Sequence, residues 1–108
     1  MTGTAPSRGL SVVPLATRGL VLLDDGARKI HVPQLRTSLA FRDGISARLD
    51  AVASKYLGGT AYVPLQGNVV IDIGAGIGEF ALWCADNGAS VIAFEPDPLA
   101  YACLERNT

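Results

Sequence analysis

The segment VVIDIGAGIGEF, residues 69–80, constrains the fold more than any other part of the sequence. It opens with a β-branched run that lacks regular polar alternation, which is typical of a parallel strand covered on both faces. Three glycines at alternate positions follow, Gly74, Gly76 and Gly78, and they predict a tight turn because glycine readily adopts positive φ. A helix is expected to begin at Glu79. The segment therefore predicts a strand, a glycine turn and a helix in direct succession.

The residues after this segment repeat the alternation. The helix over 79–87 is expected to stop at Gly88, and a second apolar strand follows over 90–94. Asp97 is a plausible N-cap for another helix over 98–106. Strand, helix, strand and helix in this order predict two parallel strands joined by a crossover. Ligands of such α/β sheets bind beyond the carboxyl ends of the strands.

The first 66 residues are less strongly patterned. Residues 1–18 are expected to form a flexible N-terminus. Residues 19–66 are interpreted as a small region with one hairpin and one helix. The hairpin has strands over 21–23 and 29–32 with a turn around Asp24-Asp25-Gly26.

A helix is predicted within RDGISARLDAVASKYLGG, residues 42–59. Asp43 is the expected N-cap, and the glycine pair at 58–59 is the expected stop. Its apolar residues recur at spacings of four, three and four, which predicts one buried stripe; the stripe is Ile45, Leu49, Val52 and Tyr56.

Composition excludes several classes of protein. The chain has 108 residues, of which 49% are hydrophobic, and its net charge is −1, which argues against disorder and against nucleic acid as a partner. No apolar run is long enough to span a membrane, and no secretory signal is recognised, so a cytoplasmic location is expected. Cys84 and Cys103 are then expected to be reduced, packed thiols rather than metal ligands. The single histidine, His31, is expected at the surface.

The charges around the glycine turn disfavour a dinucleotide. The dinucleotide fingerprint GxGxxG would need its third glycine at position 79, where this chain has Glu79. A pyrophosphate binds the positive N-terminal end of a helix, and carboxylates at Asp72 and Glu79 repel it. A P-loop fits no better, because no lysine follows the glycines.

A ligand that combines a nucleoside with positive charge fits these residues better. S-adenosylmethionine (SAM) carries an ammonium and a sulfonium group and has no phosphate. Asp72 is expected to attract the ammonium end, and Glu95 to accept hydrogen bonds from both ribose hydroxyls. The two acids are 23 positions apart (95 − 72), which suits one crossover helix and one strand.

The motifs DIGAGIGEF and VIAFEPDP resemble those of class I SAM-dependent methyltransferases, and more narrowly the FkbM-type family. The likeness covers about residues 66–107, and it departs from the family at Gly76, where asparagine is usual. It implies a Rossmann-like core, of which residues 67–108 would supply the first β-α-β-α of a doubly wound sheet. The cofactor-binding residues that it implies are Asp72, Gly74, Ala75, Gly76 and Gly78 for the methionine and ribose side, Glu95 for the ribose, and Pro96 for the adenine edge.

The resemblance further implies O-methylation of a hydroxyl on a small metabolite or sugar. It assigns no catalytic base in this sequence. The chain is expected to be the N-terminal part of a longer enzyme, and by itself to be inactive and to self-associate through an uncovered sheet edge. Two alternatives stay open, namely a non-catalytic SAM-binding or assembly module and a fragment of a nicotinamide-binding oxidoreductase.

Overall fold

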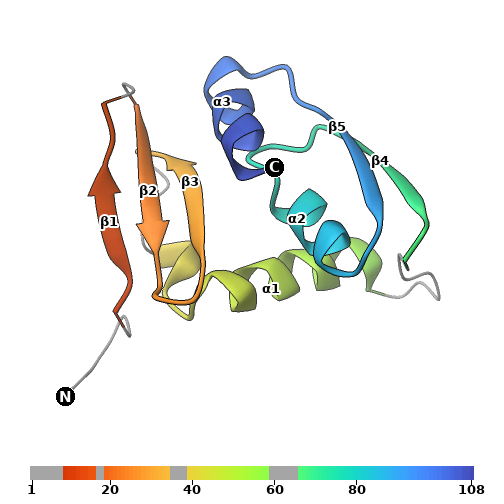
Figure 1. Cartoon of the computed structure of the whole chain (residues 1–108), viewed down its shortest axis with the longest axis horizontal. Coiled ribbons are helices and arrows are strands. Elements are labelled where there is room, and N and C mark those ends of the chain that lie inside the picture. The colour runs from red at the N-terminus through yellow and green to blue at the C-terminus, as the bar shows by residue number, and fades with distance from the viewer. Residues whose placement is uncertain (1–8, 17–18, 35–38, 59–65) are drawn as a thin grey trace.

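The computed structural model describes residues 9–16, 19–34, 39–58 and 66–108. These residues form a small mixed α/β structure with one antiparallel and one parallel sheet. Helices α2 and α3 lie between the two sheets, and α1 spans the distance from one sheet to the other (Figure 1).

The antiparallel sheet has the strand order β1-β2-β3 and contains the predicted hairpin. Strands β2 (Leu20–Asp24) and β3 (Lys29–Pro33) pair in the register that places Asp24 opposite Lys29, so the hairpin prediction is confirmed. Strand β1 (Ser11–Pro14) lies within the segment expected to be flexible, and it pairs with β2 along its whole length. Its short length and terminal proline are usual for an edge strand.

Helix α1 (Ile45–Leu57) confirms the predicted helix. Ile45, Leu49 and Val52 are buried as the apolar spacing predicts, and the first two belong to the core beneath the antiparallel sheet. Tyr56 is 61% exposed, so its assignment to the buried stripe is wrong. Its ring instead packs against Phe80 of α2 at the rim of the helix layer, with 5.0 Å between centroids.

The N-terminus of α1 is capped differently from the prediction. The N-cap residue is Gly44 and makes no side-chain cap bond, so Asp43 is not the cap. The Oδ2 atom of Asp25, in the hairpin turn, accepts the backbone N–H of Ile45 at 2.7 Å. A residue far away in the sequence therefore satisfies one of the helix's free N–H groups.

Asp25 also stabilises its own turn. Its Oδ1 atom accepts the backbone N–H groups of Ala27 and Arg28 at 2.9 and 2.7 Å. Burial acts to raise the pKa of Asp25, but these hydrogen bonds, the one from Ile45 and the charge of Arg28 outweigh it, so the pKa lies below its usual value. One ionised carboxylate thus holds the hairpin turn and the start of α1 together.

The second half of the chain has the predicted order of elements. Strand β4 (Val69–Ile73), helix α2 (Glu79–Asp86), strand β5 (Ser90–Phe94) and helix α3 (Pro98–Asn107) follow one another. Strands β4 and β5 are parallel, as predicted. Asp97 caps α3 by accepting the N–H of Ala100 within its first turn, and the helix boundaries differ from the expected ones by a single residue.

The prediction that the parallel strands are covered on both faces is wrong. Side chains alternate between a half-buried face toward α2 and an outer face. Within the described residues no helix or strand covers this outer face, and its five large apolar side chains are each at least 50% exposed; they are Val69, Ile71, Ile73, Ile92 and Phe94.

The core lies on the other side of the helices. Helix α3 packs against β3 of the antiparallel sheet, and the buried side chains of β2, β3, α1 and α3 form one cluster. Ile77, from the glycine turn, belongs to this cluster and is 1% exposed. The turn is therefore anchored in the core of the antiparallel half of the molecule.

We expect Asp25→Ala to lower the free energy of unfolding by about 1–2 kcal/mol at pH 7, because helix and turn lose a shared acceptor. The folded-state pKa is lowered, so this contribution is present above the unfolded-state value of about 3.9 and is lost as the pH falls through the folded-state value. Urea unfolding at pH 7 and at pH 3 measures both effects.

Asp43→Ala is the matched control for this experiment. Asp43 is exposed and is the cap that the sequence predicts, so its loss is expected to change stability by less than about 0.5 kcal/mol. A larger loss from Asp43→Ala than from Asp25→Ala would contradict the assignment of Asp25 as the cap.

Candidate functional site

The glycine turn lies at the carboxyl ends of β4 and β5 and is hydrogen bonded to the end of β5. The backbone N–H groups of Gly74 and Ala75 both donate to the carbonyl oxygen of Phe94 at 2.9 Å. Gly78 donates to Ala75 across the turn at 3.1 Å, and α2 begins immediately afterwards. The backbone of the turn is thus fixed relative to the strand ends.

The three glycines of the turn serve two different purposes. All have positive φ, of 76° at Gly74, 61° at Gly76 and 99° at Gly78. A Cβ atom at Gly74 or Gly76 would meet no atom within 4 Å, whereas one at Gly78 would lie 2.9 Å from the side chain of Leu104. The first two glycines therefore border open space, and the third permits close packing of α3.

Glu95, at the end of β5, is tied to this turn. Its Oε1 atom accepts the N–H of Gly76 at 2.7 Å, and its Oε2 atom accepts the N–H of Asp97 at 2.9 Å. Each carboxylate oxygen can accept a further hydrogen bond, so the side chain keeps acceptor capacity toward a ligand. Pro96 follows and is exposed beside it.

Asp72, the last polar residue of β4, has an unusual environment. Its Oδ2 atom is buried and has no hydrogen-bond partner in the part of the chain that the structure describes. Burial raises the pKa of Asp72, and the negative charge of Glu95 raises it further. Buried carboxylate oxygens in proteins nearly always have a hydrogen-bond partner, so this oxygen is available to a cation or to a hydrogen-bond donor.

Glu79, the first residue of α2, has a cationic partner that sequence reasoning missed. The Nε atom of Arg48 on α1 lies 2.6 Å from its Oε2 atom, and Arg48 also stacks over the ring of Phe41. The charge of Glu79 is thus compensated, and its predicted repulsion of a pyrophosphate is correspondingly reduced. The spacing of charges along α1 gave no signal for this pair, because it depends on how the two helices cross.

Asn107, near the end of α3, is a second residue that the sequence did not single out. Its Nδ2 atom donates to the carbonyl oxygen of Ile77 in the glycine turn at 2.8 Å. No local pattern around Asn107 indicates this contact, since the two residues are 30 positions apart.

The remaining sequence-predicted residues lie away from this cluster or act in packing. Trp83 stacks on Phe80 and donates to Asp50 of α1, which agrees with a packing role. His31 is half-buried against α3 rather than at the surface. Tyr62, for which the sequence favours simple packing over a place at a pocket mouth, lies outside the described residues.

Cys84 and Cys103 are free and buried, as predicted. Burial raises the pKa of the Cys84 thiol, and the charge of Asp72 adds to this effect. The described residues contain no cluster of histidine, cysteine, aspartate and glutamate that could hold a metal ion.

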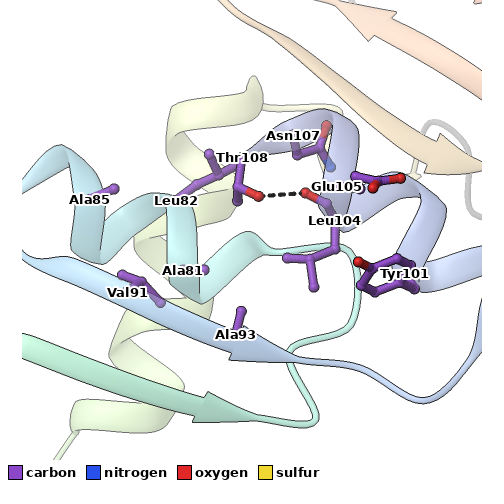
Figure 2. Close-up of a pocket in the computed structure, with 10 residues that line it drawn as sticks. All are labelled: Ala81, Leu82, Ala85, Val91, Ala93, Tyr101, Leu104, Glu105, Asn107 and Thr108. Atoms are coloured by element: carbon purple, nitrogen blue, oxygen red, sulfur yellow. Dashed lines mark hydrogen bonds between the residues drawn. The ribbon is translucent and has the colours of Figure 1, made fainter.

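A cavity of about 420 Å³ lies beside the glycine turn, between α2, α3 and β5 (Figure 2). Most of the residues that line it are apolar, including Val91 and Ala93, and none of the predicted cofactor residues is among them. Leu104 lines the cavity and also contacts Gly78, so it separates the cavity from the turn. The cavity follows from the packing of α3 on β3, which leaves space between α3 and β5.

Comparison with protein-family models, with curated proteins and with solved structures finds no match to this chain. Among the described residues, no helix has the length and apolar character needed to cross a membrane.

We expect Asp72→Asn to raise the melting temperature of the ligand-free protein at pH 7. The folded-state pKa is raised, so the ionised carboxylate destabilises the fold above the unfolded-state pKa, and protonation at lower pH relieves this. The gain near neutral pH is expected to be small, because solvent partly screens this carboxylate, and it should vanish below about pH 4, where the carboxyl is protonated in the unfolded chain as well.

Thermal unfolding followed by circular dichroism measures this gain. Asp43→Asn is the control, because Asp43 is exposed and its charge should matter little. A fall in melting temperature for Asp72→Asn at pH 7 would show that Asp72 stabilises the fold, and would contradict our description of its environment.

Proposed function

We propose that the carboxyl edge of β4 and β5 binds SAM, and that the chain is the SAM-binding part of a class I methyltransferase with a Rossmann-like core. The observation that carries this proposal is the buried Oδ2 atom of Asp72, which has no partner among the described residues and precedes the open glycine turn. A ligand that brings a cationic donor to this atom would satisfy it.

The charge at the site favours such a ligand. Asp72 and Glu95 lie close enough for the charge of one to raise the pKa of the other. The ammonium group of SAM would compensate Asp72 and restore its pKa toward the usual range, because an opposite charge favours the ionised form. The sulfonium group would add a second attraction in the same part of the site.

The ribose of SAM fits the remaining acceptors. Glu95 keeps unused lone pairs on both oxygens after its bonds to the backbone, and two adjacent hydroxyls can donate to them. The open space at Gly74 and Gly76 allows the ligand to approach the backbone of the turn closely.

A dinucleotide is disfavoured by fewer charges than the sequence suggests. Arg48 compensates Glu79, so of the two acids that the sequence sets against a pyrophosphate only Asp72 keeps its full effect. Glu95 would serve a dinucleotide ribose as well as that of SAM. The discrimination between the two ligands therefore depends mainly on Asp72.

The reaction that we infer is methyl transfer from the sulfonium of SAM to a hydroxyl of a small metabolite or sugar. Such a displacement needs alignment of the two reactants and exclusion of water, and a general base assists a hydroxyl acceptor. The rigid turn and strand ends would provide the alignment of SAM.

Isothermal titration calorimetry with SAM and with NAD tests the cofactor assignment. We expect the chain to bind SAM, and we expect Asp72→Asn and Glu95→Gln each to weaken binding at least tenfold, about 1.4 kcal/mol. Binding should strengthen as the pH rises through the pKa of Asp72, because the ionised carboxylate is the attracting form.

Glu105→Gln is the matched control, since it removes an exposed carboxylate of α3 outside the predicted site. It is expected to leave SAM affinity unchanged within about twofold. Binding of NAD in preference to SAM, with no effect of either site substitution, would overturn the assignment and favour a nicotinamide-binding protein.

A further inference from the structure

The side chain of Asn107 connects three segments that are distant in sequence. Its Nδ2 atom donates to the carbonyl oxygens of Ile77 and His31, at 2.8 and 2.9 Å. Its Oδ1 atom accepts the backbone N–H of His31 at 2.6 Å. One amide at the end of α3 therefore contacts both the glycine turn and β3.

Both the nitrogen and the oxygen of the Asn107 side-chain amide have hydrogen-bond partners. Nδ2 donates to two carbonyl oxygens, which leaves Oδ1 as the acceptor of the side chain. Oδ1 accepts the backbone N–H of His31 and also lies 3.2 Å from Nδ1 of the same residue. Because Oδ1 only accepts, Nδ1 of His31 carries the hydrogen. Two donors and two acceptor positions are thus all satisfied, which fixes the orientation of the amide.

This contact replaces a neighbouring strand. Among the described residues, strand β3 pairs with β2 on one edge and with no strand on the other. On its free edge, the N–H and the carbonyl of His31 both bond to Asn107, as they would to a further strand. Helix α3 is therefore held against β3 by hydrogen bonds in addition to apolar packing.

The hydrogen bond from Asn107 to Ile77 reaches the centre of the glycine turn. Ile77 lies between Gly76 and Gly78, which have no side chains to hold them in place. Glu95 fixes the N–H of Gly76 from the β5 side, and Asn107 fixes the carbonyl of Ile77 from the α3 side. The turn is consequently held by hydrogen bonds on both sides of the Gly76–Ile77 segment.

We infer that Asn107 is a positioning residue for the cofactor site, and that through it the antiparallel sheet stabilises the ligand-binding shape of the turn. This inference rests on the proposed function, because it assigns a purpose to the shape of the turn. Because glycine has no Cβ, the backbone at Gly76 and Gly78 can adopt many conformations besides the observed one. A turn that samples them binds its ligand more weakly, in proportion to the lost population of the binding conformation.

Asn107→Asp tests the inference. The substitution keeps the shape and the acceptor toward His31 but removes both Nδ2 donations and places an oxygen against two carbonyls. We expect SAM affinity to fall at least tenfold at a temperature where circular dichroism shows the variant to be folded. We also expect the backbone amide signals of Gly76 and Gly78 to shift in the ¹H–¹⁵N spectrum of the ligand-free protein.

Asn87→Asp is the matched control. Asn87 also donates from Nδ2 to a carbonyl, that of Trp83 at 2.8 Å, and it also lies at a helix C-terminus. Asn87→Asp is expected to affect the end of α2 as Asn107→Asp affects the end of α3, but the side chain of Asn87 bonds to Trp83 and not to the glycine turn. We expect unchanged SAM affinity within twofold and unmoved signals of Gly76 and Gly78.

The outcomes separate this inference from the proposed function. Wild-type affinity and unmoved glycine signals in Asn107→Asp would overturn the positioning role even when SAM binds. Failure of the wild-type chain to bind SAM would overturn the proposed function and with it the cofactor role of Asn107. If Asn107→Asp does not fold, Asn107→Ser, which adds no charge, provides the same comparison.

Discussion

The burial of Ile77 is the contact on which the arrangement of the two halves depends. Ile77 is the only large side chain between Ala75 and Glu79, and it inserts into the core formed beneath the antiparallel sheet. The turn at the end of β4 is thereby attached to the first half of the chain rather than only to its own sheet. The start of α2 follows directly, which brings Glu79 within reach of Arg48. The buried side chain of Ile77 and the ion pair between Arg48 and Glu79 thus both hold the turn in place.

The parallel sheet contributes less to stability than its sequence suggests. A two-stranded sheet is marginal by itself, and parallel strands are ordinarily covered on both faces. Here α2 covers one face, and the outer face of β4 and β5 stays exposed. The geometry of the turn does not depend on that outer face, because the groups that hold it, namely Glu95, Ile77 and Asn107, all act from β5 or from the core side.

The sequence predicted those features that depend on neighbouring residues. The glycine turn, the hairpin, α2 with its stop and the capped start of α3 follow from local patterns, and each is observed within a few residues of its predicted place. What it did not predict depends on contacts between distant segments. Asp25 rather than Asp43 caps α1, and Arg48 pairs with Glu79, because the hairpin and two helices meet only in the folded chain. The continuous apolar strands predict cover on both faces, but the pattern of one strand carries no information on whether a second layer is present.

The acids around the turn, which look equivalent in the sequence, have three different environments. Glu79 has Arg48 as a cationic partner, so its charge is compensated within the protein. Glu95 accepts two backbone hydrogen bonds and has capacity for more. Asp72 alone leaves a buried oxygen without a partner among the described residues, at a cost that folding does not require. Residues whose environment disagrees with stability are expected chiefly at functional positions. Asp72 is therefore the acid whose environment argues most directly for the proposed ligand. Glu95 stabilises the turn and keeps acceptor capacity for that ligand, and Glu79 belongs to the fold.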